Sequence, residues 1–256
     1  MKYAIMSDVH ANPAALETAL ADARALGCKK FAMLGDITGY GYDPKRALSL
    51  VRENFDIVLI GNHDSACLGL EQRRCDLNNP NYDIDRKCRG ELSDDDAKWL
   101  RGLRPLRKVA GMALAHGDFT EPKEWNYIIE PAVAAVNFAA RRERLLFCGH
   151  THHAEVWSLS RKKMVSRPSD ACIKGVPEAP ETIEFKLEKG MRYIVNVGSV
   201  GYPRRDFCMS YAICDPESDA FAIRRLPFDF KSYILAMLEH DIDLPGWLAH
   251  LLTSAR

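Results

Sequence analysis

Short apolar runs recur along the first half of the chain, and small or polar residues follow each of them. The run over 57–60 is Ile-Val-Leu-Ile, and it leads straight into Gly61. Runs of β-branched and aliphatic residues that are closed by a glycine are typical of buried parallel strands. The pattern therefore predicts strands over 3–6, 31–34, 57–60, 112–115 and 145–148.

The residues that follow these five runs carry carboxylate, amide and imidazole groups: Asp8, His10, Asp36, Asn62, His63, Asp64, His116, His150 and His152. Because ligands collect at the carboxyl ends of strands in open α/β sheets, we expect these side chains to meet at one rim. A single histidine after a strand is more typical of a capping or core residue than of a ligand. Five strand ends that carry such groups together are hard to explain as capping, so the set indicates a metal site.

Helices are predicted where a capping residue precedes an amphipathic pattern. Asn12 can cap free amides, Pro13 suits a first helical turn, and one face stays apolar until Gly27. Further helices are expected over 45–54, 131–141, 231–239 and 247–252, with further strands over 156–159, 182–185, 193–196, 211–214 and 220–223. The sequence therefore predicts an α/β fold.

The segment 65–104 does not follow this succession of predicted strands and helices, because it is rich in charge and in asparagine. It is expected to be mostly helical and to form a cap over the rim, since insertions at the carboxyl ends of strands stand beside the site. A solvated connection between strands is the alternative. Phe119, Trp125 and Tyr127 are expected on an exposed loop, where they could face a base or an aryl group, although ordinary packing explains them equally well.

Composition limits the classes of protein that fit. The chain has 256 residues, 47% of them apolar, which is enough for a buried core. We expect a single domain over 1–256, because the candidate site takes residues from Asp8 to His152. Lys plus Arg and Asp plus Glu are both 35, and they are not clustered, which argues against a dedicated nucleic-acid surface.

The eight cysteines contain no C-x-x-C pair, and no secretory leader stands before the first predicted strand. Reduced, packed thiols in a cytoplasmic protein are therefore expected. No apolar run approaches the length of about 20 residues that crosses a bilayer, so no membrane is expected as a partner. The oligomeric state is not indicated by the sequence.

The motifs D-x-H, G-D, G-N-H-D, H and G-H-x-H occur in this order, and together they resemble the pattern of the calcineurin-like metallophosphoesterases. The resemblance covers about the first 155 residues and resumes at Asn196-Val197-Gly198-Ser199. Residues Leu34 to Pro44 resemble the corresponding motif of the compact bacterial branch of this family, which includes phosphodiesterases and phosphatases. The resemblance implies a four-layer α/β/β/α sandwich of two mixed sheets flanked by helices.

The resemblance also implies two divalent metal ions. One would be held by Asp8, His10, Asp36 and His152, and the other by Asp36, Asn62, His116 and His150. A carboxylate with two oxygens is needed between two cations, and Asp36 is the candidate for that bridging role. Nitrogen and oxygen donors suit Mn, Fe, Zn, Co or Ni, and the donor set does not identify which of these metals is bound. The expected nucleophile is a hydroxide that bridges the metals.

Three further residues are assigned by the resemblance. His63 would point toward the scissile phosphate, with Asp64 oriented to its ring; the alternative is that His63 only supports the metal site. Arg204 ends a stretch that resembles a G-S-V-G-x-P-R loop and would bind phosphate or nucleotide. Tyr202 stands where glutamine is usual in that loop, and Asp118 stands where serine usually follows His116-Gly117.

The function predicted from the sequence is that of a metal-dependent phosphoric ester hydrolase, either a phosphodiesterase or a phosphatase. Its substrate would be a small phosphoester or a nucleotide. The alternative is a catalytically silent metal-binding scaffold or assembly subunit with the same fold, which should have lost some of the metal-binding residues or His63. All of these positions carry competent residues here.

Overall fold

The fold is that of a computed structural model, which describes residues 1–70, 87–162, 164–168, 173, 175–204, 207–242 and 244. Within this part of the chain the strands form two sheets of six strands each. The first has the order β3 (Ile57–Val58), β2 (Lys30–Met33), β1 (Tyr3–Met6), β11 (Cys208–Cys214), β12 (Ala220–Pro227), β9 (Glu181–Lys186). The second has the order β4 (Leu106–Val109), β5 (Met112–Ala115), β6 (Leu145–Cys148), β10 (Arg192–Val197), β7 (Ala154–Leu159), β8 (Val165–Ser166).

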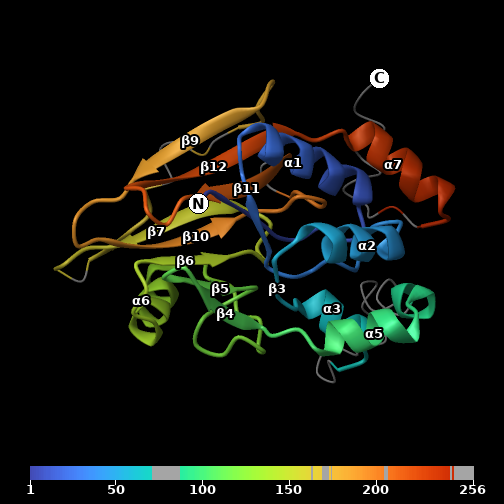
Figure 1. The fold of residues 1–256 in the computed structure, drawn as a ribbon, viewed down its shortest axis with the longest axis horizontal. Coiled ribbons are helices and arrows are strands. Elements are labelled where there is room, and N and C mark those ends of the chain that lie inside the picture. Colours follow the sequence, from blue (N-terminus) through green and yellow to red (C-terminus); the bar gives the residue numbers. More distant parts are fainter. Residues whose placement is uncertain are drawn as a thin grey trace.

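Both sheets are mixed, and each has a parallel part. In the first sheet β1, β2 and β3 run parallel, while β11 joins β1 in the antiparallel direction. In the second sheet β5, β6 and β10 run parallel, while β7 joins β10 in the antiparallel direction. Because the carboxyl ends of parallel strands meet at one edge of a sheet, the loops after β1, β2, β5 and β6 come together, and their side chains gather in two groups. Figure 1 shows the arrangement of the strands and helices.

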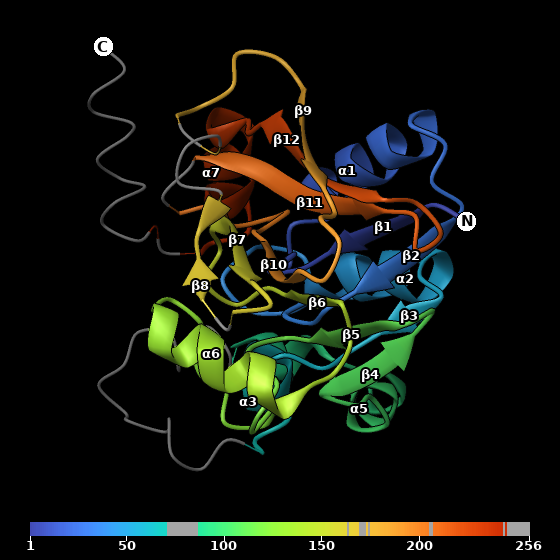
Figure 2. The same ribbon diagram turned by 90° about the vertical axis from the view of Figure 1, so that its left-hand side faces the viewer.

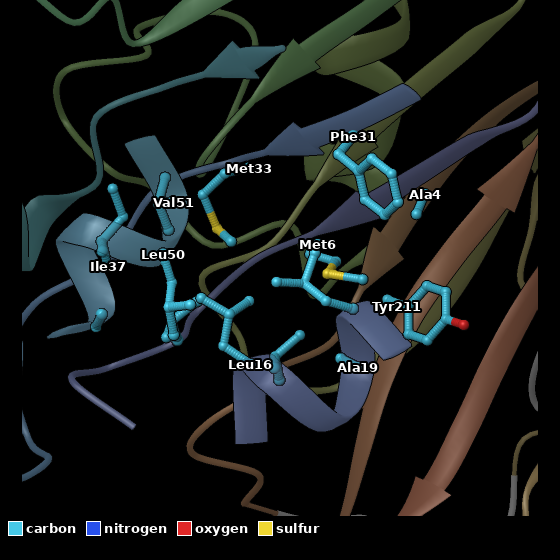
Figure 3. Packing of buried hydrophobic residues seen from close by; sticks show 14 of the residues in the cluster. Ala4, Met6, Leu16, Ala19, Phe31, Met33, Ile37, Leu50, Val51 and Tyr211 are labelled. Carbon is cyan, nitrogen blue, oxygen red and sulfur yellow. The ribbon is translucent and has the colours of Figure 1, made fainter. Parts of the chain in front are cut away.

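The two sheets pack face to face, and helices cover their outer faces. Side chains from both sheets, such as Ile5 and Phe147, form one apolar cluster between them. A second cluster joins α1 (Pro13–Ala25) and α2 (Pro44–Asn54) to the first sheet through Leu16, Val51 and Met33 (Figure 3). A third joins α6 (Pro131–Ala140) to the second sheet (Figure 2). The expected α/β/β/α sandwich is confirmed.

The helices begin where the capping residues indicate. The side chain of Asn12 accepts a hydrogen bond from the amide of Ala15, and Asp43 does the same for Arg46, with a proline in each first turn. The expected helices over 131–141 and 231–239 correspond to α6 and to α7 (Phe230–Glu239). The helix expected over 247–252 lies outside the described residues.

The segment 65–104 is described only in part, because 71–86 lie outside the described residues. Its described ends are largely helical, with the end of α3 (Asn62–Cys67), residues 87–91, and α5 (Asp94–Arg101). Ser93 and Asp96 form a capping box at the start of α5. Whether the segment acts as a cap over the rim remains a prediction.

Other expectations needed correction. Strand β3 is shorter than predicted, because Leu59 is already part of an isolated bridge to Arg104, and the edge strands β4 and β8 were not predicted. The expectation that Phe119 and Trp125 are exposed is wrong, since they are only 3% and 4% exposed. Of the three aromatic residues on that loop, Tyr127 is exposed, at 44%.

The described cysteines agree with the expected packed thiols, since each of the six is free and buried: Cys28, Cys67, Cys88, Cys148, Cys208 and Cys214. No helix in the described part of the chain has both the length and the apolar character needed to cross a membrane.

Candidate metal centre

Two buried groups of side chains meet at the carboxyl ends of the parallel strands. The first consists of Asp8, His10, Asp36 and His152, and the second of Asp36, His116 and His150. In each group the possible ligand atoms lie within 4.8 Å of one another. The loops after four separate strands therefore deliver carboxylates and imidazoles to one place, as the sequence predicted.

The histidines of the first group are held with their lone pairs facing each other. The Nδ1 atom of His10 lies 3.1 Å from the carbonyl of Thr38, and that of His152 lies 2.6 Å from the carbonyl of Tyr202. A carbonyl only accepts, so each Nδ1 must carry the proton that it donates. Each Nε2 is then unprotonated, and the two Nε2 atoms are 3.0 Å apart.

A cation fits this arrangement better than a hydrogen bond does. Burial lowers the pKa of His10 and His152 well below the ordinary value, although Asp36 and Asp8 act in the opposite direction, so neither ring supplies a second proton. Asp8 Oδ1 is buried without a hydrogen bond, and it lies 3.3 Å from His152 Nε2 and 3.6 Å from His10 Nε2. Converging lone pairs and carboxylate oxygens are the environment of a bound metal ion.

In the second group His116 is the central residue. Its Nε2 lies 3.2 Å from Asp36 Oδ2 and 3.1 Å from Asn62 Oδ1. Burial alone would lower the pKa of His116, but the charge of Asp36 and its hydrogen bond raise it to about 9. The amide oxygen of Asn62 thus lies beside the same imidazole nitrogen that contacts Asp36, and its role as a ligand stays a prediction.

Asp36 belongs to both groups through one oxygen atom. Its Oδ2 lies 3.7 Å from His10 Nε2 and 3.2 Å from His116 Nε2, while its Oδ1 accepts a hydrogen bond from the amide of His63 at 2.8 Å. Burial opposes the charge of Asp36, but the neighbouring His116 and His63 hold its pKa well below the ordinary value. The oxygen that faces both groups is thus an anion.

The backbone at these residues is strained. Left-handed conformations, with φ between 46° and 70°, occur at five of the expected ligands: Asp8, His10, Asp36, His150 and His152. Non-glycine residues rarely adopt this conformation, and strain of this kind gathers at functional sites. The strain therefore falls on residues that form the two groups.

Two glycines allow the loops to approach the carboxylates. A Cβ atom on Gly61 would lie 2.1 Å from Asp36 Oδ1, and one on Gly149 would lie 2.4 Å from Asp8 Oδ2. Both positions therefore accept only a residue without a side chain. The glycines that end the runs over 57–60 and 145–148 are needed for this close approach.

Asp64 does not have the surroundings that were expected for a partner of the His63 ring. Its Oδ1 accepts hydrogen bonds from the amides of Ile37 and Thr38 and from the Thr38 hydroxyl, and its Oδ2 accepts one from the amide of Gly61. Burial, together with the charge of Asp36, raises the pKa of Asp64 to about 6. All the hydrogen bonds found for Asp64 thus tie the loop after β2 to the start of α3.

His63 and Arg204 both lie beside the first group. His63 is 7% exposed, and the centroid of its ring is 5.0 Å from that of the His10 ring. Arg204 Nη2 donates a hydrogen bond to the Tyr40 hydroxyl at 3.1 Å, and within the described part of the chain Arg204 has no carboxylate partner. A half-buried cation without a partner anion is suited to binding an anionic ligand.

Sequence reasoning missed several residues of the site. Tyr40 and Tyr202 stack on each other next to His10, with ring centroids 4.5 Å apart. Asn196 ties the loops together, since it donates to the carbonyl of Gly149 and accepts from the amide of Gly198. Tyr40 lies between two glycines in the stretch Leu34 to Pro44, Tyr202 was noted where glutamine is usual, and Asn196 was noted as part of a motif, but the sequence assigned none of them a role.

The chain matches the model of the calcineurin-like phosphoesterase superfamily domain over residues 1–219, so it belongs to that superfamily. The resemblance found in the sequence is thereby confirmed. Together with the clustered carboxylates and imidazoles, membership supports a metal-dependent phosphoesterase.

Among its relatives is an uncharacterized protein of Methanocaldococcus jannaschii, 29% identical over 260 residues that cover 99% of this chain and 98% of that protein. The chain is also similar to the crystal structure of a metallophosphoesterase from Sphaerobacter thermophilus, with 31% identity, a TM-score of 0.75, and coverage of 97% and 96% of the two chains. A hypothetical protein from Pyrococcus horikoshii shares the fold, with 16% identity, a TM-score of 0.69, and coverage of 98% and 97%.

Proposed function

We propose that the protein hydrolyses a phosphoester with two divalent metal ions held at this rim. The observation that carries the proposal is Asp36, whose Oδ2 faces a buried imidazole of each group. When bound, two such ions lower the pKa of a water molecule and neutralise charge on the phosphoryl group. The substrate class is a small phosphoester or a nucleotide.

The metal-holding roles follow the two groups. Asp8, His10, Asp36 and His152 would hold one ion, and the backbone carbonyls on the two Nδ1 atoms keep both rings in the binding tautomer. Asp36, Asn62, His116 and His150 would hold the other. The donors are nitrogen and oxygen, so Mn, Fe, Zn, Co and Ni are the candidates.

Two cationic groups would act on the phosphoester itself. His63 is proposed to give a proton to the departing oxygen or to stabilise charge on the phosphoryl group. Arg204 is proposed to bind a phosphate oxygen with its remaining N–H donors. Asp64 would support His63 only indirectly, because its hydrogen bonds hold the loops on which Asp36 and His63 stand.

The scaffold alternative receives less support from the same residues. The scaffold alternative predicts that some of the metal-binding residues or His63 have been lost. Strained backbone at five expected ligands has a cost in stability, which indicates that these residues form a functional site. All the expected ligands and His63 are also present. These features favour an enzyme.

Metal analysis and turnover test the proposal directly. The protein would be loaded in turn with Mn, Fe, Zn, Co or Ni and assayed on p-nitrophenyl phosphate, bis-p-nitrophenyl phosphate and a panel of nucleotides. Two metal equivalents per chain and turnover of at least one ester are expected. Tight binding of two metals with no turnover of any ester would support the scaffold instead.

His63→Gln distinguishes the two roles of that residue. If His63 is an acid, the variant should keep both metals, lose little rate on nitrophenyl esters and lose about 10²–10⁴-fold on alkyl or nucleoside esters, whose leaving groups need a proton. Equal losses on all esters would favour charge stabilisation, and loss of metal would return His63 to a supporting role. His240→Gln, at the end of α7, is a matched control that should change none of these.

A further inference from the structure

Tyr40 occupies a turn that is shaped around two histidines of the site. The residue is 7% exposed and adopts a left-handed conformation with φ of 46°. A Cβ atom on Gly39 would lie 2.7 Å from His63 Nδ1, and one on Gly41 would lie 2.1 Å from the carbonyl oxygen of His10. A strained tyrosine between two such glycines indicates that its side chain has a specific task there.

The side chain of Tyr40 contacts both residues, His63 and Arg204, that would act on the phosphoester. Its ring centroid lies 4.4 Å from that of His63. Its hydroxyl accepts a hydrogen bond from Arg204 Nη2 at 3.1 Å, and the Arg204 guanidinium carbon lies 5.6 Å from the ring centroid. One residue therefore connects the end of the loop after β2 with the loop that follows β10.

The Tyr40 ring is held in place by packing against Tyr202. Tyr202 stacks on it with an angle of 13° between the rings, and the Arg204 guanidinium carbon lies 5.9 Å from the Tyr202 ring centroid. Tyr202 in turn belongs to an apolar cluster with Tyr233 and Met237 of α7. The packing of α7 thus limits the freedom of the surface on which Arg204 rests.

We propose that Tyr40 is a positioning residue of the phosphoryl site, whose hydroxyl orients Arg204 and whose ring orients His63. This inference rests on the proposed function, since it assigns Arg204 and His63 to the phosphoester. The guanidinium has five N–H donors, and the Tyr40 hydroxyl takes one of them in a fixed direction. The other donors would then be available to a phosphate oxygen.

The two contacts of Tyr40 can be separated by two substitutions. Tyr40→Phe removes the hydroxyl and keeps the ring, so Arg204 loses its orientation while His63 keeps its own. The expected result is an increase of about tenfold in KM, the size of one hydrogen bond to a charged group, with little change in kcat. The dependence of the rate on the leaving group should remain that of the wild type.

Tyr40→Leu removes the ring as well, so His63 also loses its support. Its kcat should fall, and the fall should be larger for alkyl esters than for nitrophenyl esters, as expected when a proton donor is misplaced. Tyr42→Phe is the matched control for both variants. Its hydroxyl faces Asn12 and its ring contacts Tyr233 and His240, so it should behave as the wild type.

Equilibrium binding of inorganic phosphate gives a readout that does not depend on turnover. Calorimetry on the manganese-loaded protein should show weaker binding in Tyr40→Phe and in Arg204→Gln. The double variant should be no weaker than Arg204→Gln alone, because the hydroxyl acts only through the guanidinium. Metal content, measured on the same samples, should stay at the wild-type value.

The outcomes separate this inference from the proposed function. A wild-type protein that binds no phosphate and cleaves no ester would overturn the proposed function and the inference with it. Normal phosphate binding and KM in Tyr40→Phe, with an active wild type, would overturn the inference alone. Additive losses in the double variant, or loss of metal from Tyr40→Phe, would also overturn it.

Discussion

The two halves of the candidate metal centre share Asp36 but differ in how they are held. In the first half, two carboxylates face two imidazoles, and backbone carbonyls fix both rings with their lone pairs directed inward. In the second half, Asp36 is the only carboxylate of the group, and His116 is hydrogen bonded to Asp36 and Asn62. The first half is therefore arranged for a cation, while in the second half His116 Nε2 already contacts Asp36 and Asn62.

This difference predicts an order of binding. Two carboxylates attract a divalent ion more strongly than one carboxylate and an amide do, and the first half gains most when a cation separates its converging nitrogen atoms. The second half has to exchange existing hydrogen bonds for metal contacts. We therefore expect the metal proposed for the first half to bind more tightly than the metal proposed for the second.

Asp36→Asn should have the largest effect, because it alters the oxygen that both halves use. An amide supplies no negative charge between two cations, so two-metal occupancy should be lost and kcat/KM should fall by about 10³-fold, which corresponds to several kcal/mol of transition-state stabilisation. Metal content by mass spectrometry and steady-state kinetics would measure both. Asp95→Asn, on an exposed residue of α5, is the control. Two metals retained at normal affinity would remove Asp36 from the bridging role.

Substitutions in the two halves should have different effects on the number of metal ions bound and on their affinity. Asn62→Ala should leave one tightly bound metal per chain, because the first half keeps all four of its donors. Asp8→Asn should remove the tighter site and leave only weak binding. Titration with manganese, followed by electron paramagnetic resonance, would count the ions. If Asn62→Ala loses the tighter ion and Asp8→Asn keeps it, the proposed order of binding is reversed.

The positions of these donors could be predicted because they depend on simple rules. The loops after β1, β2, β5 and β6 meet because parallel strands place their carboxyl ends at one edge, and the apolar runs identified these strands. Asp8 and His152 were therefore brought together from distant parts of the chain. The sandwich fold was supplied by the family resemblance, since the pattern alone did not determine how the two sheets pack.

The remaining features depend on contacts that no periodicity reports. The stacking of Tyr40 on Tyr202 joins residues from different loops, and both rings pack in one apolar cluster with residues of α7. The task of Asp64 could not be predicted either, because four donors from two loops must converge before its oxygen atoms are saturated. Trp125 was misjudged for a related reason: a polar loop sequence does not show that one aromatic side chain folds back into the core.

Gly149→Ala should affect the first half in particular. Its added Cβ would lie 2.1 Å from Ser7 Oγ and 2.4 Å from Asp8 Oδ2, so the loop that carries His150 and His152 must move away from Asp8. The affinity for the tighter metal should fall by about 10–100-fold, as for other substitutions that disturb the support of metal ligands. In Gly90→Ala the new Cβ meets no atom within 4 Å, and that control should bind metal normally. Unchanged metal affinity in Gly149→Ala would show that the loop can move without cost.

Thr38→Val should have the smallest effect and should act on the second half. The buried Thr38 hydroxyl donates to Asp64 Oδ1 at 2.9 Å, and valine keeps the shape of the side chain while removing this donor. Because Asp64 keeps three backbone donors, the free energy of unfolding should fall by only about 1 kcal/mol. Asp64 ties together the loops that carry Asp36 and Asn62, so the weaker metal should lose a few-fold in affinity. The tighter metal should lose less, because of its four donor side chains only Asp36 lies on these loops and only His10 is hydrogen bonded to them. Urea denaturation and manganese titration would measure these two effects, with Thr18→Val on the exposed face of α1 as the control. A change in the leaving-group dependence of the rate, with stability and metal binding intact, would instead mean that Asp64 acts through the His63 ring.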